Sequence, residues 1–290
     1  MSRLAVNKTY KLYVNGAFPR SESGRVVSVS DPKGNVIARV AHASRKDLRD
    51  AVKAAIGAQA SWAARTGYNR GQILYRIAEV LEDRAETFVG ALKTLGHSQR
   101  SATNETQAAI DRLVWYAGWC DKFSQFSGNV NPVSGPFFNI SAPEPTGVVG
   151  LLAPGVHPLL GMVSRLAPAL VPGNTTVAVT PTDHATVAID FAEVVHASDV
   201  PAGVINILTG DHEELAPWLA RHAGVNAIDL SGADRELRRV AGELASATVM
   251  RVIPGPPAED KVDWLAAAHQ SPYIIEKFTE TKTVWHPKGQ

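Results

Sequence analysis

Few residues of the chain have side chains that could carry out chemistry. The single cysteine, Cys120, follows an aromatic-rich helical segment, where it is either a catalytic or redox thiol or a small packing residue, and we expect the latter. His157 lies in a proline-bracketed loop and could act as a base or a ligand, although a structural role is the stronger expectation. Six other histidines show no HxxxH or Cys/His spacing, so the sequence predicts no metal site: His97, His184, His196, His212, His222 and His269.

The first half of the chain predicts short strands followed by helices. Strands are expected at 10–14, 26–30 and 36–40, separated by Asn-Gly and Asp-Pro-Lys-Gly turns. Ser44 and Asp47 have the spacing of a helix cap, and apolar residues then recur at helical intervals. Further helices are expected around 73–81, 88–95 and 104–122.

From Gly147 onward, strands and helices alternate. Apolar strands are expected at 148–152, 176–179, 204–208, 225–230 and 248–253, with helical segments between them. This alternation is typical of βαβ units, so we predict an α/β fold with a parallel sheet flanked by helices. Two other β-rich runs, 126–140 and 278–285, fit exposed ribbons better than core strands. The Pro-rich run 253–258 is expected to end the sheet as a linker.

Composition excludes several classes of protein. Hydrophobic residues make up 45% and charged residues 20% of the 290 residues, which is ordinary for a globular protein. Lys and Arg (29) nearly balance Asp and Glu (28), so we expect neither nucleic-acid nor membrane binding. The apolar stretches are too short to span a bilayer, and no secretion signal is evident. One cysteine permits no intrachain disulfide, so we expect a cytoplasmic protein.

Several motifs, in order and spacing, resemble those of the aldehyde dehydrogenase superfamily. The resemblance covers roughly residues 10–253 and 271–285, and it is specific as a set rather than piece by piece. The motifs are the N-terminal Tyr-Val-Asn-Gly (13–16), the aromatic helix (115–119), the EPTGVVG strand (144–150), the proline-bracketed loop (153–160), LAPALVPGNT (166–175), VPAGVINILTG (200–210) and the final strand (278–284).

The resemblance implies a Rossmann-like, nucleotide-binding-type domain over residues 1–122 and 146–253. It also implies an oligomerisation ribbon over 123–145 and 271–287. Residues 254–270 would be a linker that replaces a missing catalytic domain, since complete relatives have roughly 200 more residues in this interval, about one domain. The layout is similar to the shortened second half of class 16 aldehyde dehydrogenases.

The catalytic groups of the superfamily are not found at the matching positions. Its members form a thiohemiacetal on a cysteine, with a glutamate base and an asparagine oxyanion donor. The asparagine position is Val156, the glutamate position is about Gly255, and the cysteine-bearing segment is absent. At Cys120 the family pattern has a small residue without a catalytic role.

Cofactor contacts are expected, by resemblance, from Pro154, Thr180, Asp183, Gly210, Ser231 and Gly232. These matches are incomplete. The Lys-Pro-x-Glu that relatives use on the adenosine ribose reads Thr-Pro-Thr-Asp (180–183), and the second glycine of the pyrophosphate turn is Leu237. Asp234 near the following helix start would repel a phosphate.

We therefore expect a catalytically inactive aldehyde dehydrogenase-like subunit that needs no cofactor, with NAD or NADP binding as a possibility. Its partner would be itself or a full-length aldehyde dehydrogenase, joined through the ribbon. Two alternatives stay open at this point. One is an NAD(P)-dependent aldehyde oxidoreductase component, and the other is a nucleotide-binding module.

Overall fold

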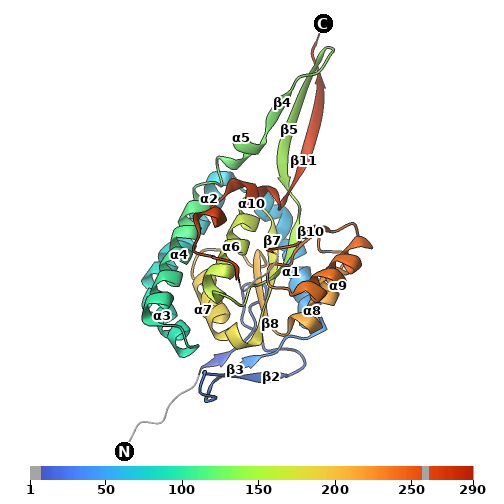
Figure 1. Cartoon of the computed structure of the whole chain (residues 1–290). Helices are drawn as coiled ribbons and strands as arrows, with labels where there is room; N and C mark the ends of the chain where they lie inside the picture. Colours follow the sequence, from blue (N-terminus) through green and yellow to red (C-terminus); the bar gives the residue numbers. More distant parts are fainter. Residues whose placement is uncertain (1–7, 257–260, 290) are drawn as a thin grey trace, which may run out of the picture.

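A parallel five-stranded sheet lies at the centre of the computed structural model, which describes residues 8–256 and 261–289 (Figure 1). The strand order is β10-β9-β6-β7-β8, and every neighbouring pair is parallel. This confirms the α/β class predicted from the alternating pattern. The strands are β6 (Val148–Leu152), β7 (Thr175–Thr180), β8 (Ile205–Thr209), β9 (Ala227–Asp229) and β10 (Arg251–Ile253).

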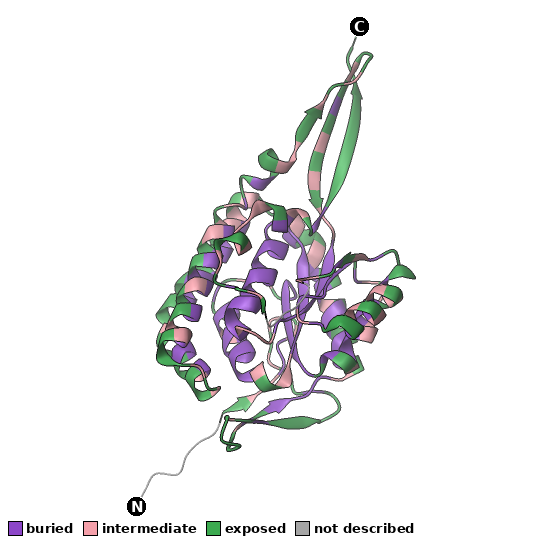
Figure 2. Cartoon of the chain, in the orientation of Figure 1, coloured by how far each residue is buried: buried purple, intermediate pink, exposed green. Residues whose placement is uncertain are grey.

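Helices cover both faces of the sheet, as the buried strand residues require. Alternate strand residues divide into two cores: Val149 and Leu151 belong to one, and Val148 and Leu152 to the other. One face packs against α6 (Pro158–Leu170) and α7 (Ala185–His196), and the other against α8 (His212–Ala220) and α9 (Arg235–Ser246). Figure 2 shows the buried strands enclosed by helices whose outer surfaces are exposed.

The N-terminal part forms a small sheet and four helices. The strands are β1 (Thr9–Tyr10), β2 (Val26–Ser30) and β3 (Val36–Ala41). The helices are α1 (Arg45–Ala63), α2 (Gly67–Asp83), α3 (Ala85–Thr94) and α4 (Gln99–Ala117). The cap predicted at Ser44 is confirmed, because its side chain and that of Asp47 form a reciprocal capping box.

Two expected boundaries in this part are wrong. The strand expected at 10–14 consists only of β1 and single bridges, one of which joins Tyr13 to Ile207 of the central sheet. The helix expected at 104–122 begins five residues earlier, since the hydroxyl of Ser98 accepts a hydrogen bond from the Ser101 amide and caps it. It ends at Ala117, before Gly118.

A three-stranded antiparallel ribbon stands away from the body of the molecule (Figures 1 and 2). A short helix, α5 (Phe123–Ser127), leads into β4 (Asn129–Asn131) and β5 (Phe137–Pro145). The final strand, β11 (Thr279–Pro287), pairs with β5 along its whole length, from Thr279 opposite Pro145 to Pro287 opposite Phe137. The two β-rich runs predicted as exposed ribbons are thus parts of one element.

The described residues 261–278, which lead into β11, pack against the body of the molecule. The predicted linker, 254–270, includes residues 257–260, which lie outside the described residues. Beyond them, the Trp264 side chain is fully buried, and its carbonyl accepts a hydrogen bond from Arg112 of α4 at 3.0 Å. The hydroxyl of Tyr116 donates to the carbonyl of His269 at 2.9 Å. A short helix, α10 (Pro272–Glu276), then leads into β11.

No helix within the described residues is long and apolar enough to cross a membrane.

Candidate functional site at the carboxyl edge of the sheet

Five of the six residues predicted to contact a cofactor lie at the carboxyl ends of the central strands. Pro154 follows β6, and Ser231 and Gly232 follow β9. Thr180 ends β7 and accepts a hydrogen bond at its carbonyl from the Gly210 amide, just after β8, at 3.1 Å. Parallel strands place their carboxyl ends along one edge of the sheet. Residues that are far apart in the sequence therefore lie along the same edge.

Asp183 lies apart from this group. It belongs to a 3-10 helix, Thr182–His184, between β7 and α7, and its side chain is 74% exposed. One carboxylate oxygen lies 3.6 Å from Nε2 of His184. The structure therefore places Asp183 on the surface beside the edge.

The loops after β6 and β9 touch each other through Gly232. Its amide donates to the carbonyl of Leu152 at 2.9 Å. A Cβ atom at position 232 would lie 2.2 Å from the carbonyl oxygen of Ala153, closer than any side chain tolerates. Gly232 was predicted to leave room for a phosphate, but in the structure the missing side chain leaves room for the backbone of Ala153.

His212 bridges the same edge from the first turn of α8. Its buried ring lies between two carbonyl oxygens, with Nε2 at 3.0 Å from Val179 and Nδ1 at 3.1 Å from Gly232. The imidazole connects the end of β7 to the loop after β9. Sequence reasoning considered His212 only as a metal ligand, and its position directly after the β8 loop was the signal that could have indicated this role.

A buried carboxylate occupies the N-terminus of α6. The Oε1 atom of Glu105, from α4, accepts hydrogen bonds from the amides of Leu159 at 2.9 Å and Leu160 at 3.3 Å. Its other oxygen lies 3.1 Å from Nδ1 of His157 and 3.6 Å from Nδ1 of His97. The first unpaired amides of α6, which in a Rossmann-like fold form an anion site, are thus bound by the protein's own acid.

The pKa values of the two histidines beside Glu105 shift in opposite directions. The hydrogen bond to Glu105 raises the pKa of His157, which also has a left-handed backbone with φ of 54°. Burial lowers the pKa of His97. Sequence reasoning identified His157 but missed Glu105, for which the only signal was a charged residue on an apolar helix face.

Carboxylates also lie at the start of the two helices on the other face. Asp234 caps α9 by accepting a hydrogen bond from the Leu237 amide at 2.7 Å. At the start of α8, Glu214 pairs with Arg25 through both oxygens, at 2.7 and 2.8 Å, which lowers the pKa of Glu214 to about 2. Side-chain ligand atoms of Glu214, Asp211 and the buried His42 lie within 4.8 Å of one another, but the Arg25 guanidinium already binds both Glu214 oxygens.

Cys120 lies at the opposite end of the sheet. Its side chain borders a pocket of about 510 Å³ that is also lined by Pro145 and Pro172, which precede β6 and β7. The thiol is buried and lies 3.6 Å from the carbonyl of Tyr116. Burial raises the pKa of the Cys120 thiol to about 12, so it is protonated at neutral pH.

Comparison with known proteins identifies the family. Residues 18–254 match the model of the aldehyde dehydrogenase family. The chain is 32% identical over 251 residues to an alpha-ketoglutaric semialdehyde dehydrogenase of Bacillus subtilis, a match that covers 85% of this chain and 51% of the relative. It is 30% identical over 250 residues to omega-crystallin of Enteroctopus dofleini, covering 84% and 50%. The chain belongs to the aldehyde dehydrogenase family.

Solved structures share the fold of this chain. PnpE from a Pseudomonas species superposes with a TM-score of 0.79 at 26% identity, over 84% of this chain and 50% of that one. HpcC from Thermus thermophilus gives 0.80 at 27% identity, over 84% and 47%. PnpE is also known in complex with nicotinamide adenine dinucleotide. The chain spans about half the length of the relatives it matches.

Two positions of the aldehyde dehydrogenase motifs can now be placed. Val156, at the position that resemblance assigns to the oxyanion-binding asparagine, lies in the loop before α6 and is partly buried. Gly255, near the position of the glutamate, has φ of 72°, and a Cβ atom there would lie 2.6 Å from the Cα of Ser231. The backbone after β10 therefore packs directly onto the loop after β9.

Proposed function

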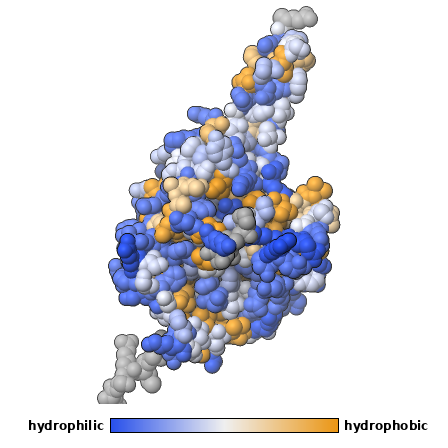
Figure 3. All heavy atoms as spheres, in the orientation of Figure 1, coloured by the Kyte–Doolittle hydropathy of each residue, from blue (hydrophilic) through white to orange (hydrophobic). Residues whose placement is uncertain are grey.

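We propose that this chain is a non-catalytic member of the aldehyde dehydrogenase family that acts as an assembly subunit. It pairs through its ribbon with a second copy of itself or with a complete aldehyde dehydrogenase. The observation that carries the proposal is the ribbon, which stands free of the body and exposes a row of apolar side chains. Apolar residues are visible on its surface near the outer end (Figure 3).

The positions that match the catalytic groups of aldehyde dehydrogenases carry residues that cannot replace those groups. The reaction requires a thiolate, a base and an oxyanion donor near one carbonyl carbon. The single thiol, Cys120, is protonated, buried and at the wrong end of the sheet. Val156 offers an apolar side chain where the donor would be, and Gly255 has no side chain to act as a base.

The residues at the carboxyl edge do not fit the diphosphate of NAD or NADP. Glu105 holds the amides of α6, and Asp234 holds an amide of α9, so a phosphate would have to displace a carboxylate at either helix. The His212 ring joins the end of β7 to the loop after β9, and Gly232 of that loop packs against Ala153 after β6. We therefore propose that assembly requires no dinucleotide.

The two faces of the ribbon differ in a way that suits pairing. Val130, Ile140 and Val284 lie directly opposite one another on its three strands and are 66%, 47% and 49% exposed. Phe138, on the same face of β5, is 51% exposed. The middle of the opposite face carries a hydrogen-bonded set of polar side chains, in which Ser141 contacts both Asn131 and Thr283. An apolar row beside a strand edge is suited to burial against a second protein.

Mass photometry and size-exclusion chromatography test this proposal. The purified chain, alone or mixed with a complete aldehyde dehydrogenase from the same source, should form a discrete assembly at micromolar concentration. Val284→Lys should abolish it, because a charge would be buried in the interface. Thr281→Lys, on the opposite face of the same strand, should leave it intact. A monomer that associates with neither protein would refute the proposal.

A second candidate is an NAD-dependent component, favoured by the gathering of five predicted cofactor residues at one edge and by the NAD complex of PnpE. Calorimetric titration with NAD and NADP decides between them. Micromolar binding, weakened by a substitution of Thr180 or Gly210, would support this candidate. No detectable heat would leave the assembly subunit as the better description.

A further inference from the structure

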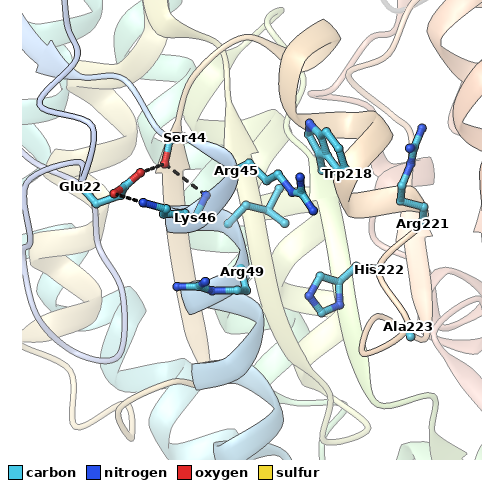
Figure 4. Close-up of a pocket in the computed structure, with 10 residues that line it drawn as sticks. Glu22, Ser44, Arg45, Lys46, Arg49, Trp218, Arg221, His222 and Ala223 are labelled. Atoms are coloured by element: carbon cyan, nitrogen blue, oxygen red, sulfur yellow. Dashed lines mark hydrogen bonds and ion pairs between the residues drawn. The ribbon is translucent and has the colours of Figure 1, made fainter.

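A groove of about 760 Å³ lies between the first turn of α1 and the end of α8 (Figure 4). Its lining does not include any residue predicted to contact a cofactor. Volumes of about 300–1,000 Å³ are usual for small-molecule sites. Most of its polar lining residues are basic: Arg45, Lys46, Arg49, Arg221 and His222.

Two arginines from different helices lie against one indole. The Arg45 guanidinium is 3.8 Å from the centre of the Trp218 ring, and the Arg221 guanidinium is 5.0 Å from the same ring. The Nε of Arg221 also donates to the carbonyl of Pro217 at 3.0 Å. In Figure 4, Arg45 reaches from α1 toward Trp218 on α8. The indole therefore makes cation–π contacts with two arginines that line the groove.

The other cations of the groove are already neutralised. Lys46 pairs with Glu22 at 3.0 Å, and Arg49 pairs with Asp50 at 2.8 Å. In the part of the chain that the structure describes, neither Arg45 nor Arg221 pairs with a carboxylate. Two neighbouring like charges without a counter-ion repel each other, and an anion bound from solution would relieve that repulsion.

We propose that this groove binds a small molecule through a phosphate group held by Arg45 and Arg221. A guanidinium that stacks on a ring through its flat face keeps its N–H groups in the plane free to donate. Phosphate matches this geometry, since its several oxygens can accept paired hydrogen bonds from both arginines. Trp218 and Ala223 supply apolar surface for the remainder of the ligand.

This site is separate from the proposed assembly function. It uses α1 and α8, whereas the ribbon is formed by β4, β5 and β11. Its lining residues also differ from Glu105 and Asp234, the carboxylates that hold the N-termini of α6 and α9. The groove can therefore bind a phosphate compound whether or not the chain assembles.

Calorimetric titration of the full chain with inorganic pyrophosphate, ADP and adenosine tests the site. Pyrophosphate and ADP should bind and adenosine should not, with an affinity that falls as salt is raised. Arg45→Ala and Arg221→Ala should each weaken pyrophosphate binding about tenfold or more, the loss expected for a charge-assisted hydrogen bond. Arg45→Lys, which keeps the charge but not the planar fork, should weaken it less.

Arg100→Ala is the matched control, because Arg100 is an exposed arginine of α4 that does not line the groove. It should bind pyrophosphate as the unmodified chain does. Circular dichroism spectra and melting temperatures would verify that each variant is folded. The proposal is overturned if the unmodified chain does not bind pyrophosphate, or if the Arg45 and Arg221 variants bind it as tightly as the unmodified chain does. It is also overturned if the chain binds single-stranded oligonucleotides but not pyrophosphate.

Discussion

The Oε1 atom of Glu105 lies 2.9 Å from the backbone nitrogen of Leu159, so a side chain of α4 caps the first turn of α6. This contact joins the N-terminal helices to the central sheet at the point where the Rossmann-like half begins. It also places a fully buried negative charge at the positive end of a helix dipole. The same contact that argues against phosphate binding therefore stabilises the fold.

Replacing Glu105 with alanine should destabilise the protein by about 2 kcal/mol, because two helix amides and a neighbouring imidazole lose their acceptor in a buried site. Urea unfolding followed by circular dichroism measures the change. Glu82→Ala, at an exposed position of α2, is the control and should cost less than about 0.5 kcal/mol. Equal losses in the two variants would contradict the capping role.

The pH dependence of folding stability should reveal how much the protonated His157 side chain contributes. Its pKa is raised in the folded protein by Glu105, so its contribution is complete below the unfolded pKa of about 6.5 and is lost as the pH rises through the folded value. The half-buried His97 has a lowered pKa and contributes to stability in the opposite direction, so a variant is needed to isolate the contribution of His157.

His157→Asn suits this purpose, since asparagine tolerates the left-handed backbone. The stability lost by this variant should be larger near pH 5.5 than near pH 8.5 in matched thermal melts. A loss that is the same at both pH values would show that the ion pair between His157 and Glu105 contributes nothing.

Local patterns in the sequence predicted the parts of the fold that depend on local interactions. The five central strands follow from their short apolar runs, and the start of α1 follows from the Ser44 and Asp47 spacing. The sequence also indicates that Gly232 is needed at its position, although the structure shows that it allows close packing against the backbone of Ala153. Each of these features can be read within a window of a few residues.

Contacts between distant segments could not be predicted in this way. Glu105 and Leu159 lie 54 residues apart, and no periodicity indicates that a glutamate of α4 will face the start of α6. Trp264 follows a Pro-rich run that indicates a linker, yet its side chain enters the core. Burial of a single aromatic in an irregular segment depends on the tertiary structure around it, which a local pattern does not report.

Trp264→Ala should destabilise the protein by about 3–5 kcal/mol, the usual cost of removing a large buried aromatic side chain. Its matched control is the adjacent Leu265→Ala, since Leu265 is 42% exposed. Chemical unfolding compares the two variants. A small loss for Trp264→Ala, similar to that of Leu265→Ala, would show that the segment after β10 is not part of the core.

The thiol of Cys120 should be unreactive in the native protein. Because burial raises its pKa to about 12, the thiolate fraction at pH 8 is negligible and the sulfur is shielded from reagent. Ellman's reagent should therefore label the chain only after guanidinium is added, with one thiol per chain. Rapid labelling without denaturant would instead indicate an activated cysteine and would reopen the question of catalysis.

Gly232→Ala and Gly242→Ala form a pair that separates a required glycine from an incidental one. A Cβ atom at position 232 would lie 2.2 Å from the carbonyl oxygen of Ala153, so the loops after β6 and β9 must move apart, and we expect a loss of about 2 kcal/mol or more. Gly242 lies inside α9, and a methyl group added there would meet nothing within 4 Å, so alanine should stabilise the helix by about 0.5–1 kcal/mol. Opposite signs in urea unfolding are the expected result. If both variants were stabilised, the contact of Gly232 with Ala153 would not be tight, and the edge of the sheet would have room for a ligand after all.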